Sequence, residues 1–176
     1  NEKPVDFVVR VESEFPEMMI GDESCVRQIL QNLLSNATKF TDRGSIVCTI
    51  CCNKKKNSSI LQVYGSVEDT GVGMSEEQLA HIFGEYVSYS DDRGLEGSGL
   101  GLSLVKQMVD LMHGHIHASS EEGVGTKIMF AFEQEQTSSV MLPPTNIDRD
   151  TLLKKPVYAV NDVKPNWVFP GARVLL

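Results

Sequence analysis

The sequence predicts an α/β protein in which helices and strands form a layered sandwich. A chain of 176 residues suits one ordinary domain with some additional tail. Hydrophobic residues make up 41% of the chain and charged residues 23%, as in soluble globular proteins. The expected elements follow the order strand, helix, two strands, helix, helix, two strands, which is typical of layered α/β domains.

The first half of the chain is expected to place one long helix between strands. Residues 5–11 are rich in β-branched side chains and predict the first strand. Asp22 is a suitable N-cap, and residues 23–40 carry apolar side chains at helical spacing. Residues 45–52 and 60–69 predict two further strands, with a lysine-rich loop between them.

The second half predicts two helices and a hairpin. A short helix is expected over 75–83, with a serine at its start as the cap. Residues 84–99 are rich in Gly, Ser and Asp, which predicts a mobile loop. An amphipathic helix over 100–112 follows, and residues 116–119 and 126–132 then form the last two strands.

The regular pattern fades after Glu133, which sets the expected domain boundary. Residues 1–133 are predicted to form one domain, and residues 134–176 are predicted to be a linker rich in polar residues and prolines. Residues 171–176 have the composition of a first strand, as if a further domain began there. The chain begins without a methionine, so we expect it to be part of a longer protein.

Composition and charge exclude several classes of function. A net charge of -8 argues against nucleic acid as a partner, because phosphate backbones require clustered Lys and Arg. No apolar run approaches the roughly 18 residues that a membrane-spanning helix needs. Four cysteines without a disulfide-like spacing predict a reducing, cytoplasmic setting. Cys48 and Cys51 form a single CxxC pair, for which reduced thiols on a strand are favoured over a zinc site.

The long helix carries a polar stripe. Asn32, Asn36 and Lys39 fall on one side of it and border the apolar face. Amide oxygens are hard ligands suited to a hydrated cation, and an ammonium group suits phosphate oxygens. The alternative is an ordinary solvated face, although two asparagines within one turn are unusual for a helix.

Two glycine-containing segments follow the helix. Asp69 ends a strand and precedes Gly71 and Gly73, so the backbone can turn sharply and the carboxylate can accept the amine of a purine. Residues 97–101 place three glycines directly before a helix, where exposed N–H groups favour an anion. Neither segment is specific by itself, and residues 97–101 fit neither a P-loop nor a dinucleotide fingerprint.

The ordered combination is specific. Residues 32–39, 69–73, 82–83 and 97–101 resemble, in this order, the asparagine box, first glycine box, phenylalanine box and second glycine box of the GHKL ATPases. Residues 28–41, 67–74 and 97–104 look specifically like those of sensor histidine kinases. The resemblance covers residues 5–132. The sequence departs from the family pattern at residues 84–86 and at His113. These departures bear on how the predicted mobile loop docks, and they do not change the residues that would bind ATP.

The resemblance implies a fold and a ligand. The fold is the Bergerat fold, a two-layer sandwich of a mixed β-sheet with helices on one face, and the ligand is ATP with Mg²⁺. Asn36 and Asn32 would bind the Mg²⁺, while Asn32 and Lys39 would act in catalysis. Asp69 would accept the adenine amine, and residues 84–99 would form a lid. The full set implied to bind ATP is Asn32, Asn36, Lys39, Phe40, Asp69, Gly71, Gly73, Met74, Phe83, Gly97, Ser98, Gly99, Leu100, Gly101 and Thr126.

The resemblance also implies a kinase that acts on a separate domain. The terminal phosphate of ATP would pass to a histidine on a dimerisation domain, and then to a response regulator or receiver domain. The chain alone would be a monomer, and the parent a homodimeric phosphoprotein, with or without a membrane anchor. If a receiver domain begins at Arg173, the parent is a hybrid kinase.

Two alternatives remain open. One is an ATP-hydrolysing member of the superfamily, although these place a catalytic Glu where this chain has Gln28 and Asn32. The other is a nucleotide-binding module without transfer activity.

Overall fold

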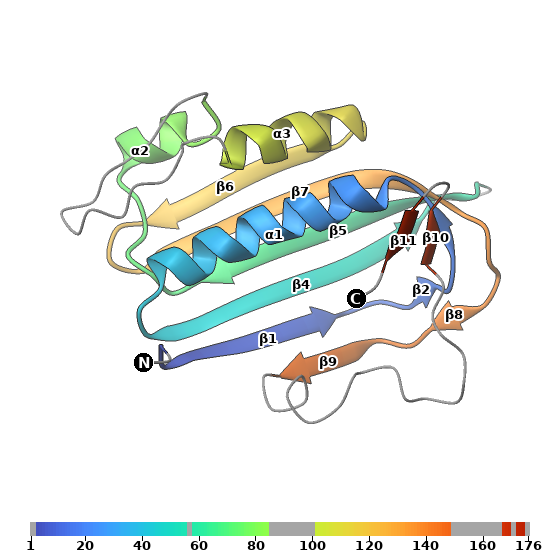
Figure 1. Ribbon diagram of the computed structural model, residues 1–176, viewed down its shortest axis with the longest axis horizontal. Coiled ribbons are helices and arrows are strands. Elements are labelled where there is room, and N and C mark those ends of the chain that lie inside the picture. Colours follow the sequence, from blue (N-terminus) through green and yellow to red (C-terminus); the bar gives the residue numbers. More distant parts are fainter. Residues whose placement is uncertain (1–2, 56–57, 85–100, 149–166, 170–171, 175–176) are drawn as a thin grey trace.

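A computed structural model describes residues 3–55, 58–84, 101–148, 167–169 and 172–174. These residues form a two-layer sandwich in which a seven-stranded sheet is covered on one face by helices (Figure 1). The elements are β1 (Val5–Val11), β2 (Phe15–Pro16), β3 (Met19–Ile20), α1 (Glu23–Phe40), β4 (Gly44–Lys54), β5 (Ile60–Asp69), α2 (Glu76–His81), α3 (Gly101–Leu111), β6 (His115–Glu121), β7 (Gly125–Gln136), β8 (Met141–Leu142), β9 (Thr145–Asp148), β10 (Trp167–Phe169) and β11 (Ala172–Val174).

The sheet is mixed. Its strands follow the order β3-β7-β5-β4-β1-β9. β6 also pairs with β7, along residues 125–131, whereas β3 pairs with residues 135–136 of the same strand. β1 runs parallel to β4, while every other described pair in the sheet is antiparallel. The predicted α/β sandwich with a mixed sheet and helices on one face is therefore confirmed.

The core lies between the helices and one face of the sheet. α1 contributes Ile29, Leu33 and Ala37, spaced at three or four residues, and α3 contributes Val105 and Val109. The strands contribute alternate residues, among them Leu61, Val63, Val67, Ile128, Phe130 and Phe132. Cys48 belongs to the same core, and burial raises the pKa of its thiol to about 11.

The helix starts follow the capping residues of the sequence. The side chain of Asp22 accepts a hydrogen bond of 3.0 Å from the Cys25 N–H and caps α1. Ser75 and Gln78 form a reciprocal capping box at the start of α2. α2 ends at His81, two residues before the predicted end, and α3 begins at Gly101.

The tail beyond Glu133 adds to the sheet. β7 continues to Gln136, β8 pairs with β2, and β9 pairs antiparallel with the edge strand β1. Part of the predicted linker therefore packs with the first domain, because β9 satisfies backbone groups at the edge of β1. The start of a further domain at residues 171–176 stays a prediction.

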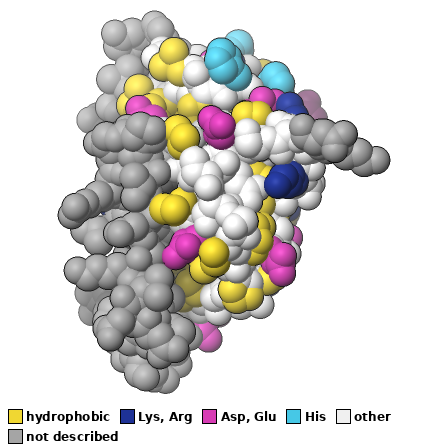
Figure 2. Space-filling model, turned by 90° about the vertical axis from the view of Figure 1, so that its right-hand side faces the viewer, with side chains coloured by type: hydrophobic (Ala, Val, Ile, Leu, Met, Phe, Trp, Pro, Cys, Tyr) yellow, Lys and Arg dark blue, Asp and Glu magenta, His cyan; other side chains and the backbone are white. Residues whose placement is uncertain are grey.

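One end of the molecule carries exposed histidines. α3 ends and β6 begins at this end, and His113, His115 and His117 are all exposed. Figure 2 shows histidine side chains at the top of this face, beside acidic and basic groups. Among the described residues, no helix is both long enough and apolar enough to cross a bilayer.

Candidate functional site

Most of the predicted site residues that the structure describes lie toward the other end of the sandwich. The C-terminal end of α1, the end of β5 and the start of β7 lie there, with the start of α3 above them (Figure 1). Asp69 at the end of β5 pairs in register with Thr126 near the start of β7. The fold thus brings together four segments that are far apart in sequence.

Asp69 is a buried carboxylate with fixed hydrogen bonds. The residue is 9% exposed, and its Oδ1 accepts a hydrogen bond of 2.8 Å from the Gly71 N–H. Burial raises the pKa of the Asp69 carboxyl, while hydrogen bonds from Gly71, Thr126 and Thr41 partly oppose the rise. A carboxylate held in this way retains acceptor capacity for a ligand, since it has two oxygens.

Gly71 and Gly73 allow backbone segments to approach closely. A Cβ at Gly71 would lie 2.4 Å from the Phe40 carbonyl oxygen and 2.8 Å from Asp69 Oδ1. Gly73 has φ +65, and a Cβ there would lie 1.9 Å from the Glu121 carbonyl oxygen. Both positions therefore require glycine, as expected for a loop that packs tightly around a site.

The loop that contains these glycines is attached on both sides. The Val72 N–H donates to the Phe40 carbonyl at 3.2 Å, and the Val72 carbonyl accepts from the Gly123 N–H at 2.7 Å. The loop thus connects the end of α1 to the β6–β7 hairpin. This arrangement holds Asp69 at a defined place relative to both.

Three hydroxyl residues complete this end of the site. Thr41 is fully buried, and its Oγ1 lies 3.5 Å from Asp69 Oδ1. Thr126 Oγ1 lies 2.9 Å from Ser120 Oγ. Thr126 was predicted as a site residue, whereas Thr41 and Ser120 were not. A hydroxyl directly after the end of α1 was the available signal for Thr41.

The polar stripe of α1 lies as predicted. Asn32, Asn36 and Lys39 are all partly buried. The amide Nδ2 of Asn32 is buried and has no hydrogen-bond partner among the described residues. A Cβ placed on Gly101 would lie 3.7 Å from Asn32 Oδ1, so the start of α3 faces this amide. An unsatisfied buried amide is costly unless a ligand completes its hydrogen bonds.

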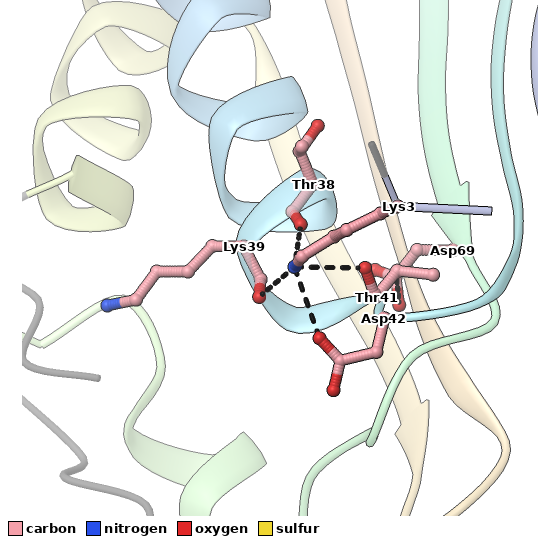
Figure 3. Close-up of polar contacts among 6 residues, drawn as sticks. All are labelled: Lys3, Thr38, Lys39, Thr41, Asp42 and Asp69. Carbon is pink, nitrogen blue, oxygen red and sulfur yellow. Dashed lines mark hydrogen bonds and ion pairs between the residues drawn. The ribbon is translucent and has the colours of Figure 1, made fainter. Parts of the chain in front are cut away.

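Lys39 and Phe40 form a neighbouring pair. The Lys39 Nζ lies 5.0 Å from the centroid of the Phe40 ring, a cation–π distance. In Figure 3 the Lys39 side chain extends away from Thr41 and Asp42. Its ammonium group therefore lies on a different side of α1 from Lys3, Thr41 and Asp42.

The remaining predicted residues divide into two groups. Phe83 lines an open groove of about 470 Å³ between α2 and β6, together with Glu76, Leu79, Ala80, Ile116, His117 and Ala118. Among the predicted ATP residues that the structure describes, Phe83 alone lines it, and Met74 is partly buried in the segment before α2. Gly97, Ser98, Gly99 and Leu100 lie outside the described residues, as does the predicted lid apart from Gly84.

A known protein family matches most of this domain. The family described as "Histidine kinase-, DNA gyrase B-, and HSP90-like ATPase" matches residues 21–136. The chain belongs to this family. The match includes α1, Asp69, the glycine loop and the whole β6–β7 hairpin.

Similar proteins place the chain with histidine kinases. Histidine protein kinase 1 of Candida albicans is 36% identical over 78% of this chain, which spans 6% of that protein. The autoinducer 2 sensor kinase/phosphatase LuxQ of Vibrio cholerae is 36% identical over 72% of this chain, which spans 15% of it. This ATPase domain therefore corresponds to a small part of such relatives and is of the histidine-kinase type.

Solved structures share the fold. Full-length ShkA in complex with AMPPNP has a TM-score of 0.64 and is 31% identical, covering 78% of this chain and 27% of ShkA. The catalytic domain of the histidine kinase ThkA has a TM-score of 0.57 and is 25% identical, covering 76% of this chain and 82% of that domain. The Bergerat fold expected from the sequence is thus confirmed.

Proposed function

We propose that this domain binds Mg–ATP and donates the terminal phosphate to a histidine on a separate dimerisation domain. The observation that carries the proposal is the buried carboxylate of Asp69 beside two glycines, at the same end of the sandwich as the polar stripe of α1. The family and the histidine kinases to which the chain is similar support it.

The adenine is proposed to bind at Asp69. The amine of adenine is a donor, and a carboxylate already oriented by Gly71 and Thr41 can accept its hydrogen bond without rearrangement. Gly71 and Gly73 have no side chains, so the space in the loop stays free. The site would then select adenine over other bases. A base without a donor at this position would leave the buried carboxylate unpaired, which is costly.

The phosphates are proposed to bind along α1. Lys39 supplies a positive charge, and Asn32 presents a buried amide nitrogen that lacks a partner among the described residues. The start of α3 at Gly101 faces Asn32, so N–H groups at a helix N-terminus are available to an anion there. Gly97, Ser98, Gly99 and Leu100 are proposed to extend this contact.

The residues on α1 also fit a magnesium ion. Asn32 and Asn36 are one helical turn apart, and their side-chain oxygens are ligands that Mg²⁺ accepts while it keeps several waters. When bound, Mg²⁺ would neutralise charge on the phosphates. Asn36, assisted by Asn32, would hold the ion, and Lys39 would hold a phosphate oxygen.

The proposed reaction is in-line phosphoryl transfer. A nitrogen of the acceptor imidazole forms a bond to the terminal phosphorus, and the bond from that phosphorus to the bridging oxygen breaks, which leaves ADP. This domain contributes positioning and charge neutralisation. The proton of the imidazole would pass to an acid beside the acceptor histidine, so this chain need not supply the base.

The histidines of this chain are poor acceptors in this reaction. His113 and His115 lie where α3 ends and β6 begins, at the end of the sandwich opposite Asp69 (Figure 1). His81 and His117 are likewise part of the domain that would hold the phosphate. We therefore expect the phosphoryl group to pass to a histidine in trans or on another domain.

Labelling with radioactive ATP tests the proposal. The chain is titrated with ATP by calorimetry and then incubated with [γ-³²P]ATP, alone and with a dimerisation domain that carries a phosphoacceptor histidine. We expect binding, no label on this chain, and acid-labile label on the added domain. Binding without any transfer would favour a nucleotide-binding module, and release of phosphate without label would favour an ATPase. Absence of ATP binding would contradict the proposal.

A further inference from the structure

Lys3 places its ammonium group at the C-terminal end of α1. Its Nζ donates to the carbonyl oxygens of Thr38 at 2.9 Å, Lys39 at 3.2 Å and Thr41 at 3.2 Å. It also lies 3.2 Å from Asp42 Oδ1. Figure 3 shows these four contacts converging on one nitrogen, with Asp69 beside Thr41. A lysine before β1 thus reaches across to the helix that carries the phosphate-binding stripe.

These contacts complete the hydrogen bonding of the helix end. The last four carbonyls of an α-helix lack partners within the helix. In α1 the Ala37 carbonyl accepts from the Thr41 N–H at 3.0 Å, and the Phe40 carbonyl accepts from the Val72 N–H at 3.2 Å. The carbonyls of Thr38 and Lys39 lie between these two in sequence, and both accept from Lys3 Nζ. A positive charge is also favourable at this end of the helix dipole.

The same contacts hold the groups that surround Asp69. Lys3 fixes the Thr41 carbonyl, and the hydroxyl of Thr41 lies against Asp69 Oδ1. The Lys3 backbone is itself held, because its carbonyl accepts from the Val5 N–H at 2.9 Å and the neighbouring Pro4 carbonyl accepts from the Gly44 N–H at 3.2 Å. A continuous set of contacts therefore runs from the start of β1 to the adenine end of the site.

We propose that Lys3 is a positioning residue for nucleotide binding, which couples the backbone at the start of β1 to Thr41 and Asp69. The inference rests on the proposed ATP site. Lys3 does not touch the nucleotide in this role; it sets where the end of α1 and the Thr41 hydroxyl lie. Because the Lys3 side chain is 42% exposed, its ion pair with Asp42 contributes little to folding.

The test compares four single substitutions in the full chain by calorimetry with ATP, ADP and adenosine. Lys3→Met removes the ammonium group, Lys3→Gln keeps the two N–H donors of an amide without the charge, and Lys3→Arg keeps the charge and several donors. Lys106→Met is the matched control, because Lys106 has similar exposure and pairs with Asp110 on the surface of α3. Thermal unfolding of each variant accompanies the titrations, and Lys3→Gln serves if Lys3→Met does not fold.

We expect Lys3→Met to weaken all three ligands by roughly 2- to 30-fold, the range that contact networks transmit to a site they do not touch. Lys3→Gln should be intermediate, Lys3→Arg near the wild type, and Lys106→Met unchanged. The loss should include adenosine, because Lys3 acts through the adenine end. Combining Lys3→Met with Asp69→Asn should add no further loss to that of Asp69→Asn alone, whereas a purely structural role would give additive losses.

Three results would overturn the inference. They are wild-type affinity in Lys3→Met, additive losses in the double variant, and an equal loss in Lys106→Met, which would indicate charge alone. If the wild-type chain itself binds no ATP, the proposed function fails and this inference fails with it. Hydrogen exchange at the Thr41 amide gives an independent reading without ligand, and unchanged exchange in Lys3→Met would also contradict the positioning role.

Discussion

The hydroxyl of Thr41 lies 3.5 Å from Asp69 Oδ1, the same oxygen that accepts the Gly71 N–H at 2.8 Å. One oxygen of the carboxylate is thus occupied by contacts from within the domain. The arrangement orients the group before any ligand arrives, and the predictions for Asp69 follow from it.

Asp69→Asn should abolish most of the affinity for ATP. The substitution replaces a charged acceptor by an amide, which can present a donor to the adenine amine. Losing a hydrogen bond to a charged group costs about 1.5–3 kcal/mol, or roughly 10- to 150-fold in affinity. Calorimetry measures the loss, and circular dichroism checks that the fold is retained. Wild-type affinity in a folded variant would exclude Asp69 from the adenine site.

The stability of the domain should depend on pH through Asp69. Burial raises the pKa of this carboxyl, so the folded domain holds its proton more tightly than the unfolded chain does. From about pH 4, where an unperturbed Asp titrates, up to the raised pKa, unfolding releases a proton and stability falls as pH rises.

The unfolding temperature of the wild type should therefore fall relative to Asp69→Asn as pH rises through this window. ATP affinity should rise over the same range, because the amine requires the ionised carboxylate. Thermal unfolding of both proteins at several pH values measures the difference. A difference that is constant with pH would mean that the Asp69 pKa is not raised in the fold.

Asn36→Ala should weaken Mg–ATP much more than magnesium-free ATP. The Asn36 side-chain oxygen is proposed to hold the cation, and loss of even an outer-shell partner of a metal costs roughly 10- to 100-fold in affinity. Titrations with Mg²⁺ and with EDTA give the comparison. Ser35→Ala, on the exposed side of the same helix, is the control and should change neither. Equal losses in both buffers would assign Asn36 a structural role.

His113→Gly should stabilise the domain. His113 has φ 54, the left-handed region, just after α3. Its N–H donates to the Asp110 carbonyl and the Gly114 N–H to the Val109 carbonyl, which is a Schellman motif. Glycine adopts this conformation without strain, so we expect a gain of about 0.5–1 kcal/mol in the free energy of unfolding. His115→Gly, within β6, should destabilise the domain instead. A lower free energy of unfolding in both variants would show that His113 is not strained.

Gly65→Ala should destabilise the core. Gly65 is buried on β5 beneath the Phe130 ring, and a Cβ there would lie 2.1 Å from the Phe130 Cζ. Such overpacking costs about 1–3 kcal/mol, measured by urea unfolding. Phe130→Leu should offset part of the loss in the double variant, because it removes the ring that the methyl meets. Additive losses would show that the two positions do not compete for the same space.

Local sequence patterns determined the elements and where the polar groups sit along them. The helical spacing of apolar residues defined α1, Asp22 and Ser75 marked helix starts, and alternation defined β5. These signals are short-range, since each depends on the period of one element or the chemistry of one cap. They also placed Asp69 at a strand end and Asn32, Asn36 and Lys39 on one stripe, although the roles of these residues stay predictions.

Tertiary structure alone decided which of these groups meet. Lys3 contacts Thr38 across 35 positions of sequence, Thr41 faces Asp69 across 28, and β9 returns from beyond Glu133 to pair with β1. No periodicity or cap encodes such contacts, because they depend on how α1 packs against the sheet and which strands become neighbours. The sequence thus determined the components of the proposed site, and packing decided that a lysine before the first strand contacts the end of the helix that carries three of them.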